Sequence, residues 1–334
     1  MRSLIGYLLC LVVALTIGYT FSPKAAPQAQ VPATRPDRVQ INGLVNLGSR
    51  VIAVGERGSI LLSDDQGVSW QAVSGATQRN ATLTAVLALD DRRVLAVGHD
   101  GWILRSLDAG SSWQEMHHDS DLGEPLLGIW SGGGDKVLAF GSFGKFYQSA
   151  DAGKTWVPQA LDIDSAHLNS MAGGSDGRRM LVGEQGLVLR TDDAGKHWQT
   201  LPAFYNGSLF GIVRLGADNW VAYGMRGHVF VSHDFGNSWA QVKVGNQLPL
   251  YGHVLLPDDS GLIIVGAGSS VVRLNAQGAL VGVTRLAGLG TLTSATMVGS
   301  RLLVGGEHGV LQGSTGSAAA LAATQATQSM RGGQ

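Results

Sequence analysis

Short runs of apolar and β-branched residues, four to seven residues long, recur along residues 39–313 and alternate with polar turns rich in Gly, Asp and Ser. One unit shows the arrangement clearly: LTAVLAL, RVLAVG, GWILRS and WQEM follow one another and are separated by DD, HD and LDAG. Short runs of this composition between turn residues are typical of β-strands. The pattern therefore predicts four strands in such a unit.

The unit is repeated along the chain, and two independent markers give the same number of copies. The first marker is a Gly-x-x-Gly turn, whose first glycines are 40 to 43 residues apart: Gly55, Gly98, Gly141, Gly183 and Gly224, with fainter copies at Gly266 and Gly306. The second is a small residue on the first strand of each unit: Gly43, Ala85, Gly128, Ser170, Gly211, Gly252 and Ser294. A small side chain there lets the innermost strands converge around one axis. Four strands in about 42 residues is the period of a propeller blade, so we expect an all-β, seven-bladed propeller over residues 39–313.

The turn between the third and fourth strands carries the most specific motif, Ser/Thr-x-Asp-x-Gly-x-x-Trp, known as the Asp-box. It occurs in the first five units, and units six and seven lack it. An Asp side chain can accept hydrogen bonds from its own turn, Gly can adopt positive φ, and Trp can pack its ring between sheets. We therefore assign a structural rather than catalytic role to its residues: Asp65 and Trp70, Asp108 and Trp113, Asp151 and Trp156, Asp193 (or its neighbour Asp192) and Trp198, and Asp234 and Trp239.

The two ends of the chain differ from the repeats. Residues 3–21 carry no charge and follow Arg2, which predicts a signal peptide or signal anchor over residues 1–22. Residues 23–38 are rich in Pro, Ala and Gln and are predicted to be a linker, and residues 314–334 a flexible tail. Unit seven lacks a Trp-bearing fourth strand, and the repeat spacing predicts that residues 30–33 supply it. We expect an exported protein, periplasmic or lumenal, either soluble or anchored by its N-terminal apolar segment.

Composition and charge exclude several function classes. Lys plus Arg number 24 against 25 Asp plus Glu, so no net positive charge favours binding to nucleic acid. Cys10 is the single cysteine and lies in the N-terminal apolar run, which excludes a disulfide or a thiolate metal site in the repeats. Phosphate-binding loop, zinc-protease and nucleophile-elbow motifs do not occur. We therefore expect neither metal nor other cofactor, no small-molecule ligand, and no enzymatic activity.

The repeats resemble the photosystem II stability/assembly factor-like family, which consists of seven-bladed propellers of Asp-box (bacterial neuraminidase, BNR) repeats. The resemblance covers residues 39–313 and is carried by the strings VGERGSILLSDDQGVSW, VGHDGWILRSLDAGSSW and VGEQGLVLRTDDAGKHW. It implies a non-catalytic scaffold or assembly factor that docks a membrane protein complex. Similar propellers occur in bacteria without photosystems. The resemblance therefore suggests a non-photosynthetic envelope protein, for example one that accompanies a transporter. The arginine-rich surface of the family does not carry over, because the repeat position of Arg57 and Arg226 holds Asp100, Phe143 and Gln185 elsewhere.

A partner-binding face is expected where the turns between second and third strands meet the connections between blades, because antiparallel strands place both on one face, opposite the Asp-boxes. Loops on a rigid scaffold are where binding residues concentrate. The candidate partner-binding residues are Glu56, Arg57, His99, Asp100, Phe143, Glu184, Met225, Arg226, Glu307 and His308.

Two alternative functions and one unusual interior residue also follow from the sequence. A sialidase-like glycoside hydrolase or carbohydrate-binding propeller would use carboxylates on the same turns, but no arginine cluster with a suitably placed Tyr accompanies them. A metal site at His117, His118, Asp119 and Asp121 is disfavoured, because neighbouring histidines on a strand point to opposite sides. His253 stands where the other units hold apolar residues, and we expect a hydrogen-bonded interior histidine.

Overall fold

The computed structural model describes residues 38–313, except 74–79, 120, 122 and 287, together with Gly6, Tyr7, residues 11–13 and Thr16. The chain divides into a unit of residues 1–33 and a unit of residues 34–334, and the second contains all the strands that the structure describes. The predicted signal segment falls largely outside the described residues, and the linker before Arg38, the closing strand at residues 30–33 and the C-terminal tail lie outside them entirely. Within the part that the structure describes, no helix is long and apolar enough to cross a membrane.

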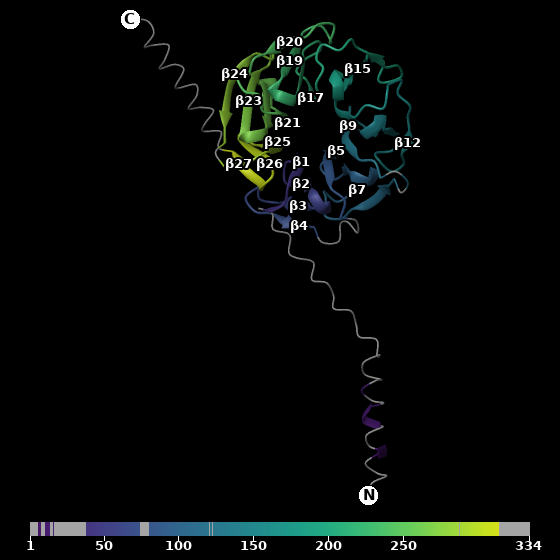
Figure 1. Ribbon diagram of the computed structural model, residues 1–334. Helices are drawn as coiled ribbons and strands as arrows, with labels where there is room; N and C mark the ends of the chain where they lie inside the picture. The colour runs from purple at the N-terminus through teal and green to yellow at the C-terminus, as the bar shows by residue number, and fades with distance from the viewer. Residues whose placement is uncertain are drawn as a thin grey trace, which may run out of the picture. The chain divides into compact units, whose positions relative to one another are not determined.

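The repeats form seven antiparallel sheets arranged in a ring in chain order, from purple to yellow in Figure 1. This confirms the predicted seven-bladed propeller. Six blades have four strands, and blade seven has three among the described residues. In each blade the strands follow one another from the innermost to the outermost, joined by hairpins.

The strands take the following places. The first, innermost strands are β1 (Ile41–Asn46), β5 (Leu83–Ala88), β9 (Leu126–Ser131), β13 (Leu168–Gly173), β17 (Leu209–Arg214), β21 (Leu250–Leu255) and β25 (Leu292–Val298). The second strands are β2 (Val51–Gly55), β6 (Val94–Gly98), β10 (Val137–Gly141), β14 (Arg179–Gly183), β18 (Trp220–Gly224), β22 (Gly261–Gly266) and β26 (Arg301–Gly306). The third strands are β3 (Ile60–Ser63), β7 (Ile103–Ser106), β11 (Phe146–Ser149), β15 (Val188–Thr191), β19 (Val229–Ser232), β23 (Ser270–Asn275) and β27 (Gly309–Gly313). The fourth strands are β4 (Gln71–Ala72), β8 (Gln114–His117), β12 (Val157–Pro158), β16 (Gln199–Thr200), β20 (Ala240–Val242) and β24 (Leu280–Arg285).

Short 3-10 segments complete the regular structure. Six form the turns between second and third strands: η2 (Glu56–Gly58), η3 (His99–Gly101), η4 (Ser142–Gly144), η5 (Glu184–Gly186), η6 (Met225–Gly227) and η8 (Ala267–Ser269). A further segment, η7 (Pro257–Asp259), joins the first two strands of blade six.

The core lies between neighbouring blades and is centred on the second strands. Every residue of β2, β6, β10 and β18 is buried, because each of these strands lies between its own sheet neighbours and has a blade on either face. Their near-continuous apolar sequences suit burial on both faces. The four largest fully buried side chains are Trp102, Trp220, Tyr223 and Phe140.

The ring closes between blades seven and one through side-chain hydrogen bonds. Asn46 Nδ2 donates to the carbonyl oxygen of Met297 at 2.7 Å, and Thr293 Oγ1 donates to that of Ile41. On the Asp-box side, Arg301 Nη2 donates to Gln66 O at 3.1 Å. Blades seven and one are therefore held together at several levels by residues that the structure describes.

The first glycine of each Gly-x-x-Gly turn is required by space. An ideal Cβ at Gly55, Gly98, Gly141, Gly183, Gly224, Gly266 or Gly306 would lie 2.0 to 2.3 Å from the carbonyl oxygen of the residue before the first strand. At Gly55, Gly98 and Gly141, φ lies between −167° and −172°, an extended value open to any residue. The repeat therefore keeps glycine because two backbone segments meet there.

The Asp-boxes act as hydrogen-bonded turns in all five blades that contain them. In blade three, Ser149 Oγ donates to Asp151 Oδ1 at 2.8 Å and accepts from Gly153 N at 2.8 Å. The backbone N–H of Thr155 donates to Asp151 Oδ1 at 2.8 Å, and these hydrogen bonds lower the pKa of Asp151 to about 2. In blade four the carboxylate with this role is that of Asp193.

Each Asp-box is also tied to the preceding blade. The residue before its glycine has positive φ, between 54° and 63°, and its carbonyl oxygen accepts a hydrogen bond from a basic side chain of the blade before it. The donor and acceptor pairs are Arg50 and Ala109, Arg105 and Ala152, Lys136 and Ala194, Arg190 and Phe235, and Arg301 and Gln66. The Asp-box thus fixes both its hairpin and the spacing between blades.

The Asp-box tryptophans are only half-buried, and their rings lie less enclosed than the motif alone suggests. The indole Nε1 of Trp113 donates to Gly110 O at 2.8 Å, and that of Trp156 donates to Gly153 O at 3.1 Å. These rings therefore cover the turn from outside, while Trp102 and Trp220 fill the core.

Candidate binding face at the channel mouth

The turns between second and third strands lie beside the connections between blades, on the face opposite the Asp-boxes. Asp119 N donates to Asp100 O at 2.9 Å, and Gly186 N donates to Gly207 O at 2.8 Å, each linking a connection to a turn. We call this side the turn face. The central residues of five turns have left-handed backbone, with φ between 52° and 57°: Arg57, Asp100, Phe143, Gln185 and Arg226.

The predicted site residues of the turn face differ in exposure. Seven of the ten are exposed: Arg57, His99, Phe143, Met225, Arg226, Glu307 and His308. Glu56, Asp100 and Glu184 are half-buried. The turn face thus combines charged groups with two exposed apolar side chains, Phe143 and Met225.

The three glutamates among these candidates are engaged in holding the fold. Glu184 Oε1 accepts from His167 N at 3.0 Å, Glu307 Oε2 from Thr291 N at 2.7 Å, and Glu56 Oε1 from Gln40 N at 3.4 Å. They occupy one repeat position, and each fixes the backbone that leads into the first strand of its own blade. Their carboxylates therefore serve as structural acceptors.

A ring of seven residues at the mouth of the central channel was not predicted from the sequence. Near the start of every first strand the pairing register with the second strand shifts, so that one residue is left over. Such a β-bulge re-aims the side chain of the extra residue. The seven bulge residues are Asn42, Thr84, Leu127, Asn169, Phe210, Tyr251 and Thr293.

Four of the bulge residues connect neighbouring blades. Asn42 Nδ2 donates to Leu83 O at 2.8 Å, Thr84 Oγ1 to Leu126 O at 2.7 Å, and Asn169 Nδ2 to Leu209 O at 2.8 Å. The hydrogen bond of Thr293 to Ile41 is the fourth of this kind and joins blade seven to blade one. The side chains of the four polar bulge residues therefore hold neighbouring blades together.

The other three bulge residues are apolar or aromatic, and two of them form a stacked pair. The rings of Phe210 and Tyr251 have centroids 5.3 Å apart and an interplanar angle of 28°. Tyr251 is 37% exposed although it is a large side chain. Exposed aromatic residues on a polar rim are typical of binding surfaces, because they add contact area at a low cost in conformational entropy. We call Phe210 and Tyr251 the aromatic pair.

Below the mouth lies a cavity of about 340 Å³, lined by the first strands of all seven blades and by Phe140 and Tyr223 of the second strands. Its lining contains no Asp, Glu, Lys or Arg. Gly128 and Gly211 make room for these two rings, since a Cβ would lie 2.3 Å from Phe140 and 2.0 Å from Tyr223. At Gly252 a Cβ would instead meet Thr293 O of the next blade at 2.3 Å. The small residue of the first strand therefore has two uses. At Gly252 it lets neighbouring first strands approach closely, and at Gly128 and Gly211 it makes room for an aromatic ring.

His253 borders this cavity, and its Nδ1 lies 2.6 Å from the hydroxyl oxygen of Tyr223. A hydrogen-bonded interior histidine was the expected arrangement. Burial lowers the pKa of His253 to about 4 and raises the pKa of Tyr223. The neutral imidazole is therefore the form that the folded protein favours.

Acidification is expected to destabilise the protein through His253. The unfolded chain takes up this proton near pH 6.5 and the folded protein at about pH 4, so the unfolded state binds more protons between these values. Stability contributed by His253 is complete above pH 6.5 and falls by up to about 3 kcal/mol toward pH 4, at about 1.36 kcal/mol per pH unit. His253→Gln should flatten this slope in urea unfolding measured from pH 7 to 4. The Asp-box carboxylates lose their contribution mainly as the pH falls through 3.8, at the end of this range, so an unchanged slope in His253→Gln would contradict the assignment.

The metal interpretation of His117, His118, Asp119 and Asp121 gains no support among the described residues, which contain no group of His, Cys, Asp and Glu suited to a metal ion. Asp119 is paired with Lys145, whose Nζ also lies 3.1 Å from Glu124 Oε2. All three side chains are largely buried, with 13 to 22% exposed. This connection is thus anchored by an ion cluster.

The fold and this site define a class of protein: a seven-bladed Asp-box propeller with an aromatic pair at the mouth of its central cavity. The family described as "Photosynthesis system II assembly factor YCF48" matches residues 46–178. This match covers less than half of the chain, and it bears out the resemblance of the repeats to the photosystem II assembly factor-like BNR propellers.

Solved structures share the fold at low sequence identity. YCF48 bound to a D1 peptide matches at 15% identity and a TM-score of 0.66, over 83% of this chain and 93% of that one. YCF48 from Cyanidioschyzon merolae matches at 16% identity and a TM-score of 0.63, over 84% and 96%. The WD40 propeller domain of Doa1 matches at 16% identity and a TM-score of 0.65, over 82% and 92%. No curated protein matches the sequence.

Proposed function

We propose that this chain is an exported, non-catalytic scaffold or assembly factor that docks a membrane protein complex outside the cytoplasm. The partner is either a complex handled in the manner of a photosystem assembly factor or an envelope transporter. Docking uses the turn face and the channel mouth. The observation that carries the proposal is the aromatic pair, which leaves the mouth apolar at blades five and six while polar bulge residues link other blades.

Two further observations support a protein as the partner. YCF48, which shares the fold, has been solved with a D1 peptide bound. On the turn face, the exposed side chains of Arg57 and Arg226 accompany those of Phe143 and Met225. A centre of aromatic anchors within a charged rim is the usual arrangement of a protein-binding surface.

The alternative of a sialidase-like hydrolase or carbohydrate-binding propeller receives no comparable support. The carboxylates of Glu56, Glu184 and Glu307, which a hydrolase would need, accept backbone N–H groups of their own blades. The purified protein should therefore release no sugar from sialosides, and release that is abolished by Glu184→Gln would contradict the scaffold proposal.

Partner binding should depend on the aromatic pair. The protein is captured from cross-linked envelopes, its partner is identified by mass spectrometry, and the affinity of the purified partner is then measured. Phe210→Ala with Tyr251→Ala should weaken binding at least tenfold, because aromatic anchors at an interface centre typically contribute about 2 kcal/mol or more. The matched control is Leu280→Ala with Val281→Ala, an exposed apolar pair on the outer strand of blade six, and it should bind as the wild type does.

Charge changes separate the two faces of the propeller. Reversal of Arg57 and Arg226 to Glu should slow association and alter its salt dependence, as expected for charges at a rim. Lys154→Glu on the Asp-box face should leave binding unchanged. Loss of binding in Lys154→Glu, with Arg57→Glu and Arg226→Glu harmless, would show that the partner uses the Asp-box face.

A further inference from the structure

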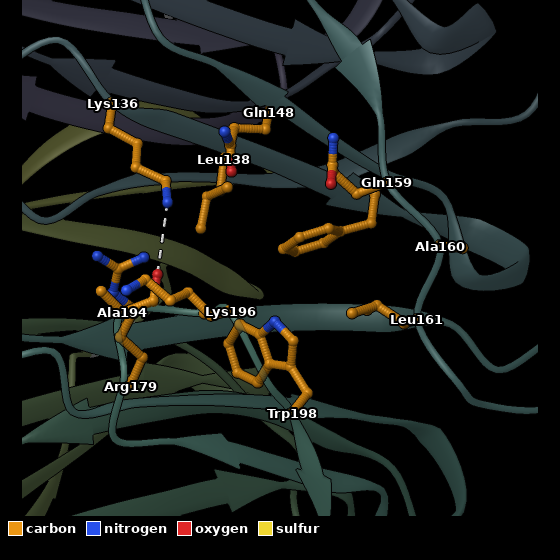
Figure 2. A pocket seen from close by; sticks show the side chains of 12 residues that line it. Lys136, Leu138, Gln148, Gln159, Ala160, Leu161, Arg179, Ala194, Lys196 and Trp198 are labelled. Atoms are coloured by element: carbon orange, nitrogen blue, oxygen red, sulfur yellow. Dashed lines mark hydrogen bonds between the residues drawn. The ribbon is translucent and has the colours of Figure 1, made fainter.

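A second cavity lies between blades three and four, away from the channel, and has a volume of about 100 Å³. Figure 2 shows three basic side chains, those of Lys136, Arg179 and Lys196, gathered at one end of it, with Gln159 and Leu161 at the other. The remaining lining is mainly apolar or amide: Leu138, Phe146, Gln148, Ala160, Ala194, Gly195 and Trp198. No carboxylate lines this cavity, although three cations do.

Arg179 is the most unusual of the three cations because it is both buried and unpaired. Arg179 is only 8% exposed, and its Nε and Nη1 atoms have no hydrogen-bond partner among the described residues. Its guanidinium lies 4.9 Å from the ring centroid of Trp130. A cation–π contact of this kind offsets part of the charge but satisfies none of the N–H donors.

The position of Arg179 is apolar in the neighbouring blades. As the first residue of the second strand it corresponds to Val51, Val94, Val137 and Trp220, all of which are buried. The propeller fold therefore does not need an arginine at this point. A buried, unpaired charge costs stability, so an arginine here is better explained by a ligand that it binds than by packing.

Among the described residues, Lys136 lacks the aspartate partner that the basic residue at its repeat position has in other blades. It stands immediately before the second strand, where Arg50, Arg93 and Arg178 occur in other blades. Each of those arginines pairs with at least one aspartate. Like Arg50, Lys136 donates to the Asp-box carbonyl oxygen of the next blade, here Ala194 O at 3.4 Å, and burial together with the charges of Arg179 and Lys196 lowers its pKa.

The boundary between blades three and four is also looser than the other boundaries that contain an Asp-box. There the glycine of the Asp-box packs on an apolar side chain of the preceding blade, 2.5 to 2.8 Å from an ideal Cβ: Leu303, Ile52, Leu95 and Met180. At Gly195 the nearest atoms belong to Trp198 and Arg179 of its own blade, at 3.5 and 3.6 Å. Space and uncompensated positive charge thus occur at the same boundary.

We propose that this cavity binds a small oxyanion, namely a carboxylate or phosphate group held by Arg179, Lys136 and Lys196. A guanidinium and two ammonium groups match the geometry and charge of such a group. The walls formed by Phe146, Leu161 and Trp198 favour an organic carboxylate with a short apolar body over inorganic phosphate. The sequence predicted no small-molecule ligand, and the site lies at an Asp-box boundary, apart from the turn face.

The test is a titration of the full-length protein with isobutyrate and with inorganic phosphate at constant ionic strength, with chloride as the reference anion. Thermal unfolding should shift upward with the bound anion and not with chloride, since a ligand that binds only the folded state stabilises it. A larger shift with isobutyrate identifies an organic carboxylate, and a larger shift with phosphate identifies a phosphate group. Equal curves in all three salts would overturn the proposal.

Variants separate a ligand-binding arginine from a structural one. Arg179→Val restores the residue type of the other blades, so it should fold at least as stably as the wild type in chloride and should lose the anion-dependent shift. Lys196→Gln should weaken anion binding several-fold. Its control is Lys154→Gln, at the same Asp-box position in blade three, where the turn packs on Leu95. If Arg179→Val is less stable in chloride and the wild type gains nothing from either anion, Arg179 serves only to pack on Trp130.

Discussion

Gly141→Ala is expected to lower the free energy of unfolding by about 3 kcal/mol, because the new methyl group has no space. Its Cβ would lie 2.2 Å from Pro125 O and 2.7 Å from Leu126 Cα, and both are backbone atoms at the start of a first strand. Overpacking against side chains commonly costs about 1 to 3 kcal/mol, and a rigid backbone neighbour places this change at the upper end. Urea unfolding of the purified protein measures the loss.

Gly282→Ala is the matched control for Gly141→Ala. Gly282 also lies in a strand, β24, but nothing stands within 4 Å of its ideal Cβ, and its φ lies outside the left-handed region. Its replacement should be neutral or slightly stabilising. If Gly141→Ala and Gly282→Ala unfold at the same urea concentration, the close backbone approach is not what maintains glycine in the repeat.

Trp220→Ala is expected to cost about 3 to 5 kcal/mol, the range for removing a large aromatic side chain from a core. Trp220 is fully buried between blades four and five, among residues that include Met180, Leu201 and Phe230. Its Nε1 atom has no hydrogen-bond partner among the described residues, so the ring contributes by packing.

Trp220→Phe distinguishes packing from hydrogen bonding. It retains most of the aromatic volume and removes, with part of the fused ring, an indole N–H that no described group accepts, so it should cost well under half as much as Trp220→Ala. Thermal and urea unfolding of both variants provide the comparison. An equal loss in Trp220→Phe would mean that the indole N–H is essential.

The architecture could be predicted from the sequence because successive blades repeat the same motif residues. The Asp-box of blade three, for example, has the same Ser, Asp and Gly as those of blades one and two, and its hydrogen bonds are local to the turn. Local contacts of this kind follow from residue order. The number of blades followed from counting such units.

The channel mouth could not be predicted in the same way. The bulges that expose Phe210 and Tyr251 depend on a one-residue register shift between two strands, and Leu209 to Gly211 looks like an ordinary strand segment in the sequence. The structural use of Glu184 was hidden for a similar reason, since its acceptor role depends on how close His167 N lies.

The anion cavity is a different case, because the sequence did contain its signal. Arg179 interrupts a position that is apolar in other blades, in the string RMLVG where VIAVG and VLAVG stand in blades one and two. What the sequence could not show is that Arg179 and Lys196 meet Lys136 of the preceding blade, because that contact depends on the docking of two sheets.

Site-specific photo-crosslinking tests the central proposal most directly. A photoreactive amino acid replaces Tyr251 at the channel mouth, and a second variant carries it in place of Lys154 on the Asp-box face. After irradiation of intact cells, we expect position 251 to crosslink to a membrane protein and position 154 to give no such product. Crosslinks to that protein from position 154 alone, or from neither position while it still co-purifies with the propeller, would contradict docking at the channel mouth.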